Sequence, residues 1–468
     1  MQNLIRTLLL LLLTQFGCQQ KLVEQTNAEA TRPNFVIIYT DDQRYDALGC
    51  RTSTTAITPT LDSLCASGMY FKNAFVTLSI CSPSRAALLT GRYGSANGVT
   101  TYGEVHINEG EQTFAQLLRE LGYQTGIVGK WHLADSPAKL GFDFATHFFG
   151  NGPWYDRNVI RQGKDTVAEG FIEDYIADEA IGFLEGTQQS EEPYLLFYCP
   201  QLPHLDNKFN WDVTQETLAQ YDDRAIDLPK NWPDEKLTGK PEYLLTERHR
   251  QKALSYGYQD PDTLAYQTKR YYAAITEMDA AMGRMLAKVR ALPNAENTYI
   301  IFMSDNGWFI GDHLFTSKVL AYEESIRVPL IINGPGIKPE VNEDLVLNID
   351  VFPTLINILG ETTPPELHGV SLLPALNKQD WPQKREHIYY EAPTPQLGSQ
   401  PLAAIRTVQY KYIETYDETD STRVVFQELY DLQEDPYELD NQIGREGYLE
   451  LTNALAKSLQ EQKLFIRK

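Results

Sequence analysis

Residues 34–42 have the sequence NFVIIYTDD, in which a run of apolar and β-branched residues ends at two aspartates. A continuous apolar run of this length is typical of a strand that is buried on both faces of a parallel sheet. Three further runs of this kind, at 124–129, 194–199 and 298–303, each follow a predicted helix, and another buried strand is predicted at 328–333. Strands that alternate with helices predict an α/β fold with a mostly parallel central sheet flanked by helices.

Two other parts of the chain have a different character. Residues 205–265 are polar, rich in Pro, Tyr and Trp, and show little periodicity. We therefore expect an insertion whose loops contact the substrate and select it. Residues 376–468 contain predicted strands at 387–391, 403–413 and 428–431 and a predicted closing helix at 448–465. This order predicts a smaller C-terminal α+β subdomain with an antiparallel sheet, after a main catalytic domain of residues 33–375.

Polar side chains directly follow two of the predicted parallel strands. Asp41 and Asp42 end the first run, and Asp305 and Asn306 come just after the strand at 298–303. The carboxyl ends of parallel strands line one crevice, so these oxygens could converge on a hard divalent cation such as Ca²⁺ or Mg²⁺. Each of these residues taken alone is more commonly a turn residue or a helix N-cap.

Cys81 opens the segment CSPSRAALLTGR at residues 81–92. Ser82 can cap the helix that follows, and Pro83 can occupy its first turn. Cys81 then stands at a helix N-terminus, where backbone N–H groups and the helix dipole favour an anion, and Arg85 lies one turn further along. These features alone are compatible with a thiol of low pKa or with an ordinary buried cysteine.

The same segment resembles the signature of the type I sulfatases, in which the cysteine is oxidised to formylglycine during biosynthesis. Other blocks look like those of the family and come in the family's order: NFVIIYTDDQRYDALGC, TGIVGKWHL, the pair Pro203-His204, MSDNG, GDHLFTSKVLAYEESIRVPLII and, near residue 434, EDPYELDNQ. The resemblance implies the fold of the alkaline phosphatase superfamily with a small C-terminal subdomain.

The resemblance also implies a metal site. One divalent cation, usually Ca²⁺ with Mg²⁺ as the alternative, would be bound by four oxygen-bearing side chains: Asp41, Asp42, Asp305 and Asn306. Cys81 would become formylglycine, whose hydrate oxygen completes the metal shell, and Arg85 would hold that hydrate and the metal carboxylates. A formylglycine-generating enzyme, or an equivalent maturation enzyme, is therefore an implied partner.

The remaining residues of the family pattern would act on the sulfate group. Lys130 and His132 would contact the hydrate and the sulfate. His204 and Lys318 would bind sulfate oxygens, and His204 would also protonate the leaving alcohol. His313, in the block GDHLF, would lie at the rim of the substrate pocket.

The expected activity is that of a sulfuric ester hydrolase. The hydrate offers an oxygen nucleophile, and its second hydroxyl can later lose a proton, so that the aldehyde re-forms and sulfate leaves. An export signal at residues 1–18 and the aromatic-rich insertion make a sulfated carbohydrate or polysaccharide fragment the expected substrate. The alternatives are a phosphoester hydrolase on the same fold and a non-catalytic surface lipoprotein that binds sulfated glycans.

The composition narrows the class of partners. The chain has 468 residues with 41 basic and 63 acidic side chains, which gives a net charge of −22. Binding to nucleic acid needs clustered Lys and Arg, so we expect no nucleic-acid partner. A small anionic substrate stays compatible with this charge, because a few cations at the bottom of a cleft can reverse the local field.

Residues 1–18 look like an export signal. Arg6 precedes the apolar run 8–13, and Gly17-Cys18 resembles a bacterial lipoprotein cleavage site, so Cys18 is an expected lipidation site. Residues 19–32 are polar and are predicted to be a tether. We therefore expect a protein of the periplasm or cell envelope, held at the outer membrane by a lipid anchor, with plain secretion as the alternative. In an exported chain the pairing of three further cysteines stays open: Cys50, Cys65 and Cys199.

Overall fold

The computed structural model describes residues 32–50 and 55–467, and the described residues from 33 onward form one compact unit. The predicted export signal, with Cys18 and almost all of the predicted tether, lies outside the described residues. Within the described ranges, no helix is both long enough and apolar enough to cross a membrane.

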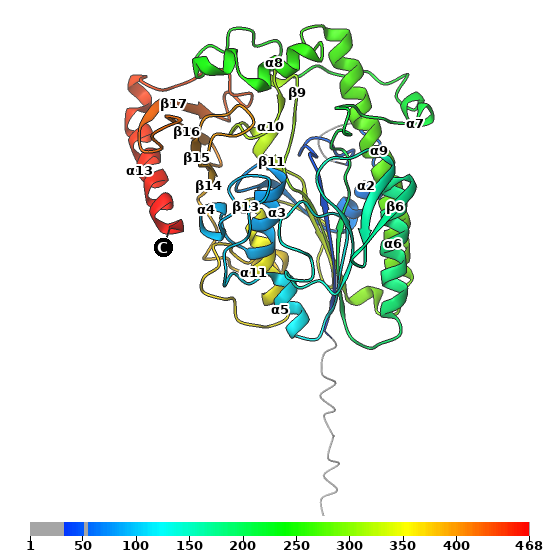
Figure 1. Cartoon of the computed structure of the whole chain (residues 1–468). Coiled ribbons are helices and arrows are strands. Elements are labelled where there is room, and N and C mark those ends of the chain that lie inside the picture. Colours follow the sequence, from blue (N-terminus) through cyan, green and yellow to red (C-terminus); the bar gives the residue numbers. More distant parts are fainter. Residues whose placement is uncertain (1–31, 51–54, 468) are drawn as a thin grey trace, which may run out of the picture. The chain divides into compact units, whose positions relative to one another are not determined.

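Parallel strands form the middle of the central sheet (Figure 1). Across the sheet their order is β8 (Thr298–Ser304), β1 (Asn34–Thr40), β7 (Tyr194–Cys199), β3 (Gln124–Lys130) and β4 (Phe144–Phe148). All of β1 is buried: Phe35 and Ile37 belong to the hydrophobic core on one face of the sheet, and Val36 and Ile38 to the core on the other. The continuous apolar run therefore marks a strand that is covered on both faces, as predicted.

Further strands extend both edges of this sheet. Beyond β8 lie β12 (Leu330–Asn333), β2 (Met69–Phe75), β11 (Arg327–Val328) and β13 (Glu340–Leu347), and beyond β4 lie β5 (Tyr155–Arg161) and β6 (Lys164–Phe171). The single strand predicted at 328–333 is in fact two short strands, β11 and β12, which both run antiparallel to their neighbours. The β5–β6 hairpin was not predicted, because most of its side chains are polar and exposed.

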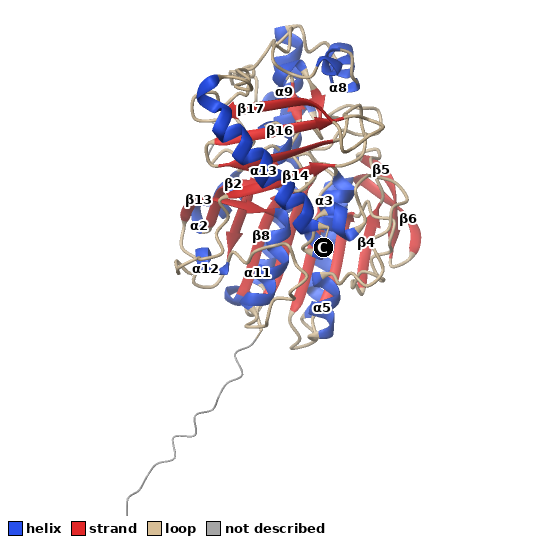
Figure 2. Ribbon diagram, turned by 90° about the vertical axis from the view of Figure 1, so that its left-hand side faces the viewer, coloured by secondary structure: helices blue, strands red, loops and turns tan. Residues whose placement is uncertain are grey.

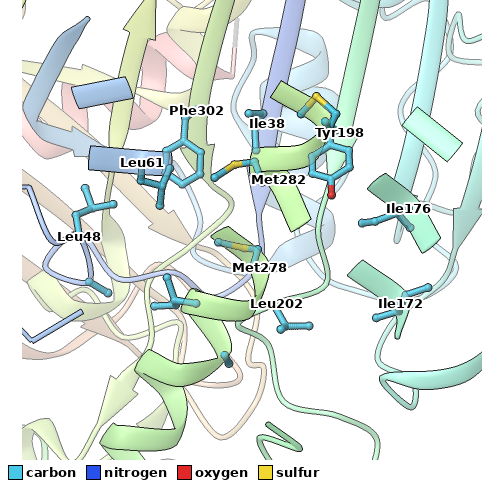
Figure 3. Close-up of a cluster of buried hydrophobic side chains, with 14 of the residues drawn as sticks. Ile38, Leu48, Leu61, Ile172, Ile176, Tyr198, Leu202, Met278, Met282 and Phe302 are labelled. Atoms are coloured by element: carbon cyan, nitrogen blue, oxygen red, sulfur yellow. The ribbon is translucent and has the colours of Figure 1, made fainter. Parts of the chain in front are cut away.

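Helices cover both faces of the sheet (Figure 1). One face carries α2 (Pro59–Ser67), α6 (Ile172–Thr187) and α9 (Pro261–Ala291), and the other carries α3 (Cys81–Thr90), α5 (Phe114–Glu120) and α11 (Val351–Ile358). Figure 3 shows part of the first core, where Met278 and Met282 of α9 pack with Ile38 of β1 and Phe302 of β8. The α/β fold class expected from the sequence is confirmed.

The C-terminal region forms a second, smaller sheet (Figure 2). Its antiparallel strands are β14 (His387–Ala392), β15 (Leu402–Thr407), β16 (Tyr410–Tyr416) and β17 (Val424–Asp431), and α13 (Leu449–Ile466) packs against it. The single strand predicted at 403–413 is two strands, β15 and β16, that are joined by a turn at residues 408–409. The turn carries no Gly or Pro, which explains why the sequence did not reveal it.

The predicted insertion contains little regular structure. Its elements are α7 (Gln215–Ala219), η1 (Glu242–Leu245) and α8 (Arg248–Ser255). The other short elements of the described chain are α4 (Gly94–Asn97), η2 (Ala295–Asn297), β9 (Phe309–Ile310), η3 (Asp312–Leu314), β10 (Thr316–Ser317), α10 (Glu323–Ile326), η4 (Asn348–Asp350), α12 (Leu373–Leu376) and η5 (Glu446–Tyr448). Cys50 and Cys65 form a disulfide, a pairing that the sequence left open, whereas Cys81 and Cys199 are free and buried.

Candidate active site

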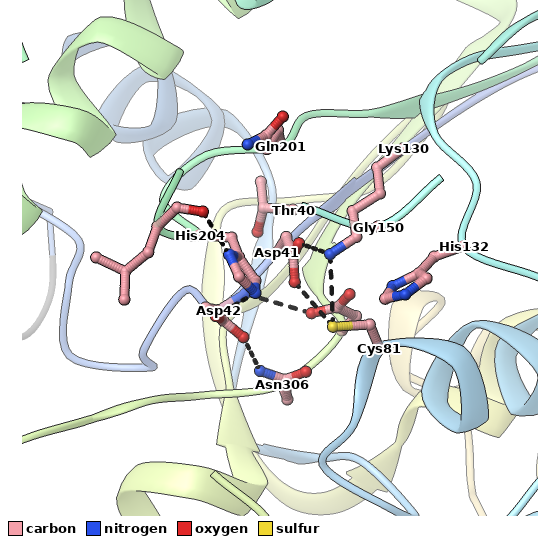
Figure 4. Close-up of polar contacts among 12 residues, drawn as sticks. Thr40, Asp41, Asp42, Cys81, Lys130, His132, Gly150, Gln201, His204 and Asn306 are labelled. Atoms are coloured by element: carbon pink, nitrogen blue, oxygen red, sulfur yellow. Dashed lines mark hydrogen bonds and ion pairs between the residues drawn. The ribbon is translucent and has the colours of Figure 1, made fainter. Parts of the chain in front are cut away.

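The polar side chains that follow β1 and β8 lie together at the carboxyl edge of the sheet. The two strands are parallel neighbours in register, with Thr40 opposite Ser304. The backbone N–H of Asp305 donates to the carbonyl of Thr40 (2.9 Å), and the N–H of Asp42 donates to Oδ1 of Asp305 (3.3 Å). Nδ2 of Asn306 donates to Oδ1 of Asp42 (2.5 Å; Figure 4). The predicted convergence of these groups is confirmed.

Cys81 is the first residue of α3 and lies against this cluster (Figure 4). Its thiol donates to Oδ1 of Asp41 (3.2 Å) and accepts from Nζ of Lys318 (2.9 Å) and from Nζ of Lys130 (3.5 Å). Burial, together with the charge of Asp41, raises the pKa of the thiol to about 12. The interpretation of Cys81 as a thiol of low pKa is therefore wrong, and the unmodified side chain would be a poor nucleophile.

Arg85 lies one turn along α3 from Cys81 and is almost fully buried. Its Nε and Nη2 donate to Oδ2 of Asp305 (3.1 and 2.9 Å), and its Nη1 donates to the carbonyl of Lys130 (2.8 Å). Burial would lower the pKa of Arg85, but Asp305 outweighs it and raises that pKa, so the guanidinium stays charged. Arg85 thus joins the end of β8 to the end of β3.

Lys130 ends β3, and His132 follows on the next loop. The ammonium of Lys130 is fully buried and forms an ion pair with Asp41. Burial would raise the pKa of Asp41, but Lys130 and the neighbouring cations outweigh it and hold that pKa well below its usual range. Burial and the charge of Lys130 lower the pKa of His132 well below its usual range, so its ring is neutral.

Ser82 does not cap α3 as the sequence suggests. The N-cap residue is Ile80, and no side chain caps the helix there. The hydroxyl of Ser82 instead donates to the carbonyl of His132 (2.7 Å). This bond joins the start of α3 to the loop after β3, and so keeps His132 next to the segment that carries Cys81.

His204 reaches the cluster from the loop after β7 (Figure 4). Its Nδ1 donates to the carbonyl of Leu205 (2.8 Å), which leaves Nε2 facing Oδ2 of Asp42 at 3.5 Å. Burial lowers the pKa of His204, although Asp42 and Asp41 oppose this shift. The ring therefore presents its second nitrogen, Nε2, to Asp42 and the cluster.

Glu173 fixes the loop that leads to His204. The carboxylate of this fully buried residue, near the start of α6, accepts the backbone N–H groups of Gln201 (2.8 Å) and Leu202 (3.0 Å) through Oε1. The side chain of Gln201 in turn binds Arg157 of β5. Sequence reasoning missed both Glu173 and Arg157, because nothing local distinguishes them from the other charged residues of the amphipathic helix and the polar hairpin.

Lys318 completes the cationic side of the cluster. Its Nζ donates to Oδ1 of Asp42 (2.5 Å) and to Oδ1 of Asn306 (3.2 Å), in addition to its contact with Cys81. Burial would lower the pKa of Lys318, but Asp42, Cys81 and the nearby carboxylates outweigh it and raise that pKa well above its usual range. The ammonium is therefore charged.

His313 has a different environment from the other predicted site residues. It is fully buried, its Nδ1 lies 3.0 Å from Oδ2 of Asp234, and its Nε2 lies 3.1 Å from Nδ2 of Asn231. Both ring nitrogens are thus engaged by residues of the insertion. The arrangement does not support the substrate contact predicted for His313 at the pocket rim, and indicates that the ring joins the insertion to the main domain.

The donor set of the cluster fits a divalent cation. Ligand atoms of Asp41, Asp42, Cys81 and His204 all lie within 4.8 Å of one another. Oδ2 of Asp42 is buried and has no hydrogen-bond partner among the residues that the structure describes. Three carboxylates face three buried cationic side chains in this cluster, so a bound divalent ion would add positive charge that attracts an anionic ester.

Comparisons with protein families match nearly the whole described chain. A family model described as Sulfatase matches residues 33–361. A second model, described as N-sulphoglucosamine sulphohydrolase, C-terminal, matches residues 311–464 and so includes the smaller sheet.

Individual proteins agree with these matches. The chain is 30% identical to an N-acetylglucosamine-6-O-sulfatase of Bacteroides thetaiotaomicron, over 92% of this chain and 86% of that protein. It is 29% identical to an ulvan-active sulfatase of Formosa agariphila, over 95% of this chain and 84% of that protein. A structure solved in complex with its substrate D-glucosamine-2-N,6-O-disulfate superposes with a TM-score of 0.83 at 26% identity, over 93% of this chain and 98% of that one.

Proposed function

The chain belongs to the sulfatase family of the alkaline phosphatase superfamily and is a sulfuric ester hydrolase, and we propose that it removes sulfate from a sulfated carbohydrate through a formylglycine formed from Cys81. One observation carries the catalytic part of this proposal. Sγ of residue 81 lies 3.2 Å from a carboxylate oxygen of Asp41 and 2.9 Å from the ammonium of Lys318. An oxygen at this position would meet both the carboxylates that suit a cation and the cations that suit a sulfate group.

The modification explains how a poor nucleophile becomes a good one. The thiol of Cys81 is protonated at neutral pH, because burial and Asp41 raise its pKa. In the hydrated aldehyde, one hydroxyl at residue 81 would attack sulfur as the S–O bond to the alcohol breaks. The second hydroxyl would then lose its proton, so that the aldehyde re-forms and the C–O bond to sulfate breaks without attack by water on the sulfated residue. A maturation enzyme that oxidises Cys81 is therefore part of the proposal.

A divalent cation belongs to the same proposal. The residues that would hold it are those at the two strand ends: Asp41, Asp42, Asp305 and Asn306. When bound, the ion supplies positive charge that stabilises an oxyanion at residue 81. We propose Ca²⁺, because an all-oxygen set of carboxylates and an amide suits a hard cation.

The remaining side chains bind the sulfate and move protons. Lys130 and Lys318 flank residue 81 within 3.5 Å and would hold the sulfate oxygens in a buried site, where such contacts are stronger than in water. In its imidazolium form, which Asp42 favours from 3.5 Å, His204 would deliver the Nε2 proton to the leaving alcohol. His132, which is neutral, would take the proton of the second hydroxyl at residue 81. Arg85 would hold the Asp305 carboxylate and the Lys130 backbone in place.

The names of the relatives support a carbohydrate substrate. They include an N-acetylglucosamine-6-O-sulfatase, an ulvan-active sulfatase and a structure with a sulfated glucosamine. We propose 6-O-sulfated N-acetylglucosamine, free or at the end of an oligosaccharide, as the first substrate to test.

We also propose that the chain is exported to the cell envelope and lipidated at Cys18. The signal-like residues 1–18 support export, and so does the Cys50–Cys65 disulfide, because disulfides persist in oxidising compartments. Fractionation of cells that express the full chain tests this, with Cys18→Ser as the control. Membrane-bound wild type and a released variant are expected; equal distribution of the two proteins would contradict lipidation.

Release of sulfate from a defined panel tests the activity. The protein would be produced with a formylglycine-generating enzyme and incubated with sulfated mono- and oligosaccharides, and free sulfate would be measured. We expect release from at least one 6-O-sulfated sugar and none with Cys81→Ala. An aryl sulfate and the phosphate ester of the same phenol would be compared in parallel. Faster hydrolysis of the phosphate than of the sulfate would contradict the assignment of reaction type.

A further inference from the structure

Lys318 lies on a short backbone segment with an unfavourable conformation. The residues on either side of it, Ser317 and Val319, have φ angles of 79° and 85°. This left-handed region is disfavoured for residues with a side chain, and most strongly for β-branched residues such as valine. Such a conformation persists only where surrounding structure holds it, so groups outside residues 317–319 must fix the backbone there.

Two hydroxyl groups hold both polar backbone groups of Val319. Its N–H donates to Oγ of Ser79 (3.2 Å), and its carbonyl accepts from the hydroxyl of Tyr390 (2.5 Å). Oγ of Ser79 also lies 2.7 Å from the Tyr390 oxygen and 2.8 Å from Oγ of Ser325. Because Tyr390 gives its only hydroxyl hydrogen to Val319, the other hydrogens run from Ser325 to Ser79 and from Ser79 to Tyr390. Each hydroxyl hydrogen therefore has an acceptor.

A third contact holds Lys318 itself. Nε2 of His249, in α8, lies 2.6 Å from the carbonyl of Lys318 and donates to it. His249, Ser79 and Tyr390 are all fully buried, so these bonds are protected from competition by water.

The three groups come from remote parts of the chain. Tyr390 belongs to β14 of the C-terminal sheet, His249 belongs to the insertion, and Ser79 precedes Cys81 by two residues. The C-terminal sheet is itself fixed to the segment that follows Lys318. Glu323 accepts the ammonium of Lys411, and the hydroxyl of Tyr322 donates to Glu428 (2.8 Å).

We propose that Tyr390, Ser79 and His249 are positioning residues for Lys318. They hold Ser317 and Val319, on either side of Lys318, in the left-handed conformation that brings the ammonium to 2.9 Å from Sγ of residue 81. This inference rests on the proposed function, since it takes Lys318 as a ligand of the sulfate group. It gives the C-terminal sheet and the insertion a direct part in building the active site.

A double-mutant cycle with inorganic sulfate tests the proposal. Sulfate binding would be measured by calorimetry on the mature wild type, Tyr390→Phe, Lys318→Ala and the double variant. We expect Tyr390→Phe to weaken binding by about tenfold, because the hydroxyl that holds the Val319 carbonyl is lost. The double variant should bind as weakly as Lys318→Ala alone, because the hydroxyl acts only through that side chain. Independent losses that multiply in the double variant would overturn the proposal.

A matched variant controls for general damage to the C-terminal sheet. The hydroxyl of Tyr412, also fully buried in this sheet, contacts Glu414 and Gln427. Tyr412→Phe should bind sulfate as the wild type does, at a similar melting temperature to Tyr390→Phe. Equal loss of sulfate binding in the two variants would contradict a specific role for Tyr390.

A crystal structure of Tyr390→Phe gives a readout that needs no binding or turnover. Val319 should leave the left-handed region, and the Lys318 ammonium should move away from residue 81. An unchanged segment with Lys318 in place would overturn the proposal. A wild type that binds sulfate but hydrolyses no sulfate ester would instead contradict the proposed function and leave the positioning role standing.

Discussion

The two sides of the active site are built in different ways. The carboxylate side, formed by the residues at the ends of β1 and β8, directly follows two neighbouring parallel strands. The register of these strands places Asp42 beside Asp305. On the cationic side, Lys130 also ends a strand. His204 and Lys318 instead lie on loops, and distant side chains hold those loops: Glu173 before His204, and Tyr390 beside Lys318. We therefore expect the carboxylates to keep their positions as long as the sheet is folded, whereas the loops of the cationic side can move while the fold persists.

The largest expected effect is at Cys81, which lies between the two sides. Cys81→Ala removes the atom that becomes the nucleophile, so turnover of a sulfated sugar should fall by at least about 10⁴-fold. The melting temperature should change little, because the side chain is small. Comparable turnover in the variant would refute the assignment of the nucleophile.

Removal of the cation should affect mainly the carboxylate side. Treatment with a chelator should abolish turnover and lower stability by about 3 kcal/mol, because a ligand present at about 100 times its dissociation constant contributes that much. Turnover and the melting temperature would be followed as Ca²⁺ is added back. Full activity in metal-free protein, confirmed by elemental analysis, would contradict the cation site.

Paired variants should separate the two sides directly. Asp305→Ala leaves the buried guanidinium of Arg85 without its carboxylate and should cost about 3–5 kcal/mol of stability as well as activity. Lys318→Ala should lower kcat/KM by about 10²–10³-fold, because a contact to the sulfate oxygens is lost. Its loss of stability should be smaller than that of Asp305→Ala in the Ca²⁺-loaded protein, where the bound ion offsets the charge of Asp42 that Lys318 leaves unpaired. Denaturant unfolding measures the stability of each variant, and steady-state kinetics measure its activity. A larger loss of stability in Lys318→Ala than in Asp305→Ala would contradict the difference between the two sides.

The smallest expected effect is at Glu173. Glu173→Ala removes the acceptor for two backbone N–H groups ahead of His204, and should lower kcat by about 10–10²-fold. The loss should be greater for a sugar sulfate than for 4-nitrophenyl sulfate, because the poorer leaving group needs the proton more. Glu173→Gln, whose amide oxygen can accept both N–H groups, should keep most of the activity. Equal losses on the two esters would indicate general disruption of the site.

The difference between strand ends and loops also explains which residues of the site could be predicted from the sequence. The apolar run that ends at Asp41 and Asp42 predicts both a buried strand and the position of its terminal carboxylates, because sheet geometry is regular. The segment from Cys81 carries its own family signature. Tyr390 and His249 carry no such sign, since their importance comes from contacts over 71 and 69 residues of sequence to Val319 and Lys318.

The errors in the fold prediction, and the unexpected surroundings of His313, have a related cause. The turn between β15 and β16 lacks the residues that usually mark turns, and the β5–β6 hairpin lacks an apolar face. His313 lies within a family-like block, yet its ring binds Asp234 and Asn231 of the insertion. In each case the outcome depends on tertiary contacts that local sequence does not express.

The most direct test of the central claim is the mass of the peptide that contains residue 81, measured beside kcat on the same preparations. Samples made with different amounts of a formylglycine-generating enzyme would span the range of modification. We predict that the aldehyde-bearing fraction of the peptide and the rate of sulfate release rise in proportion, from zero. Full sulfate release by protein whose residue 81 is entirely an unmodified thiol would contradict the account.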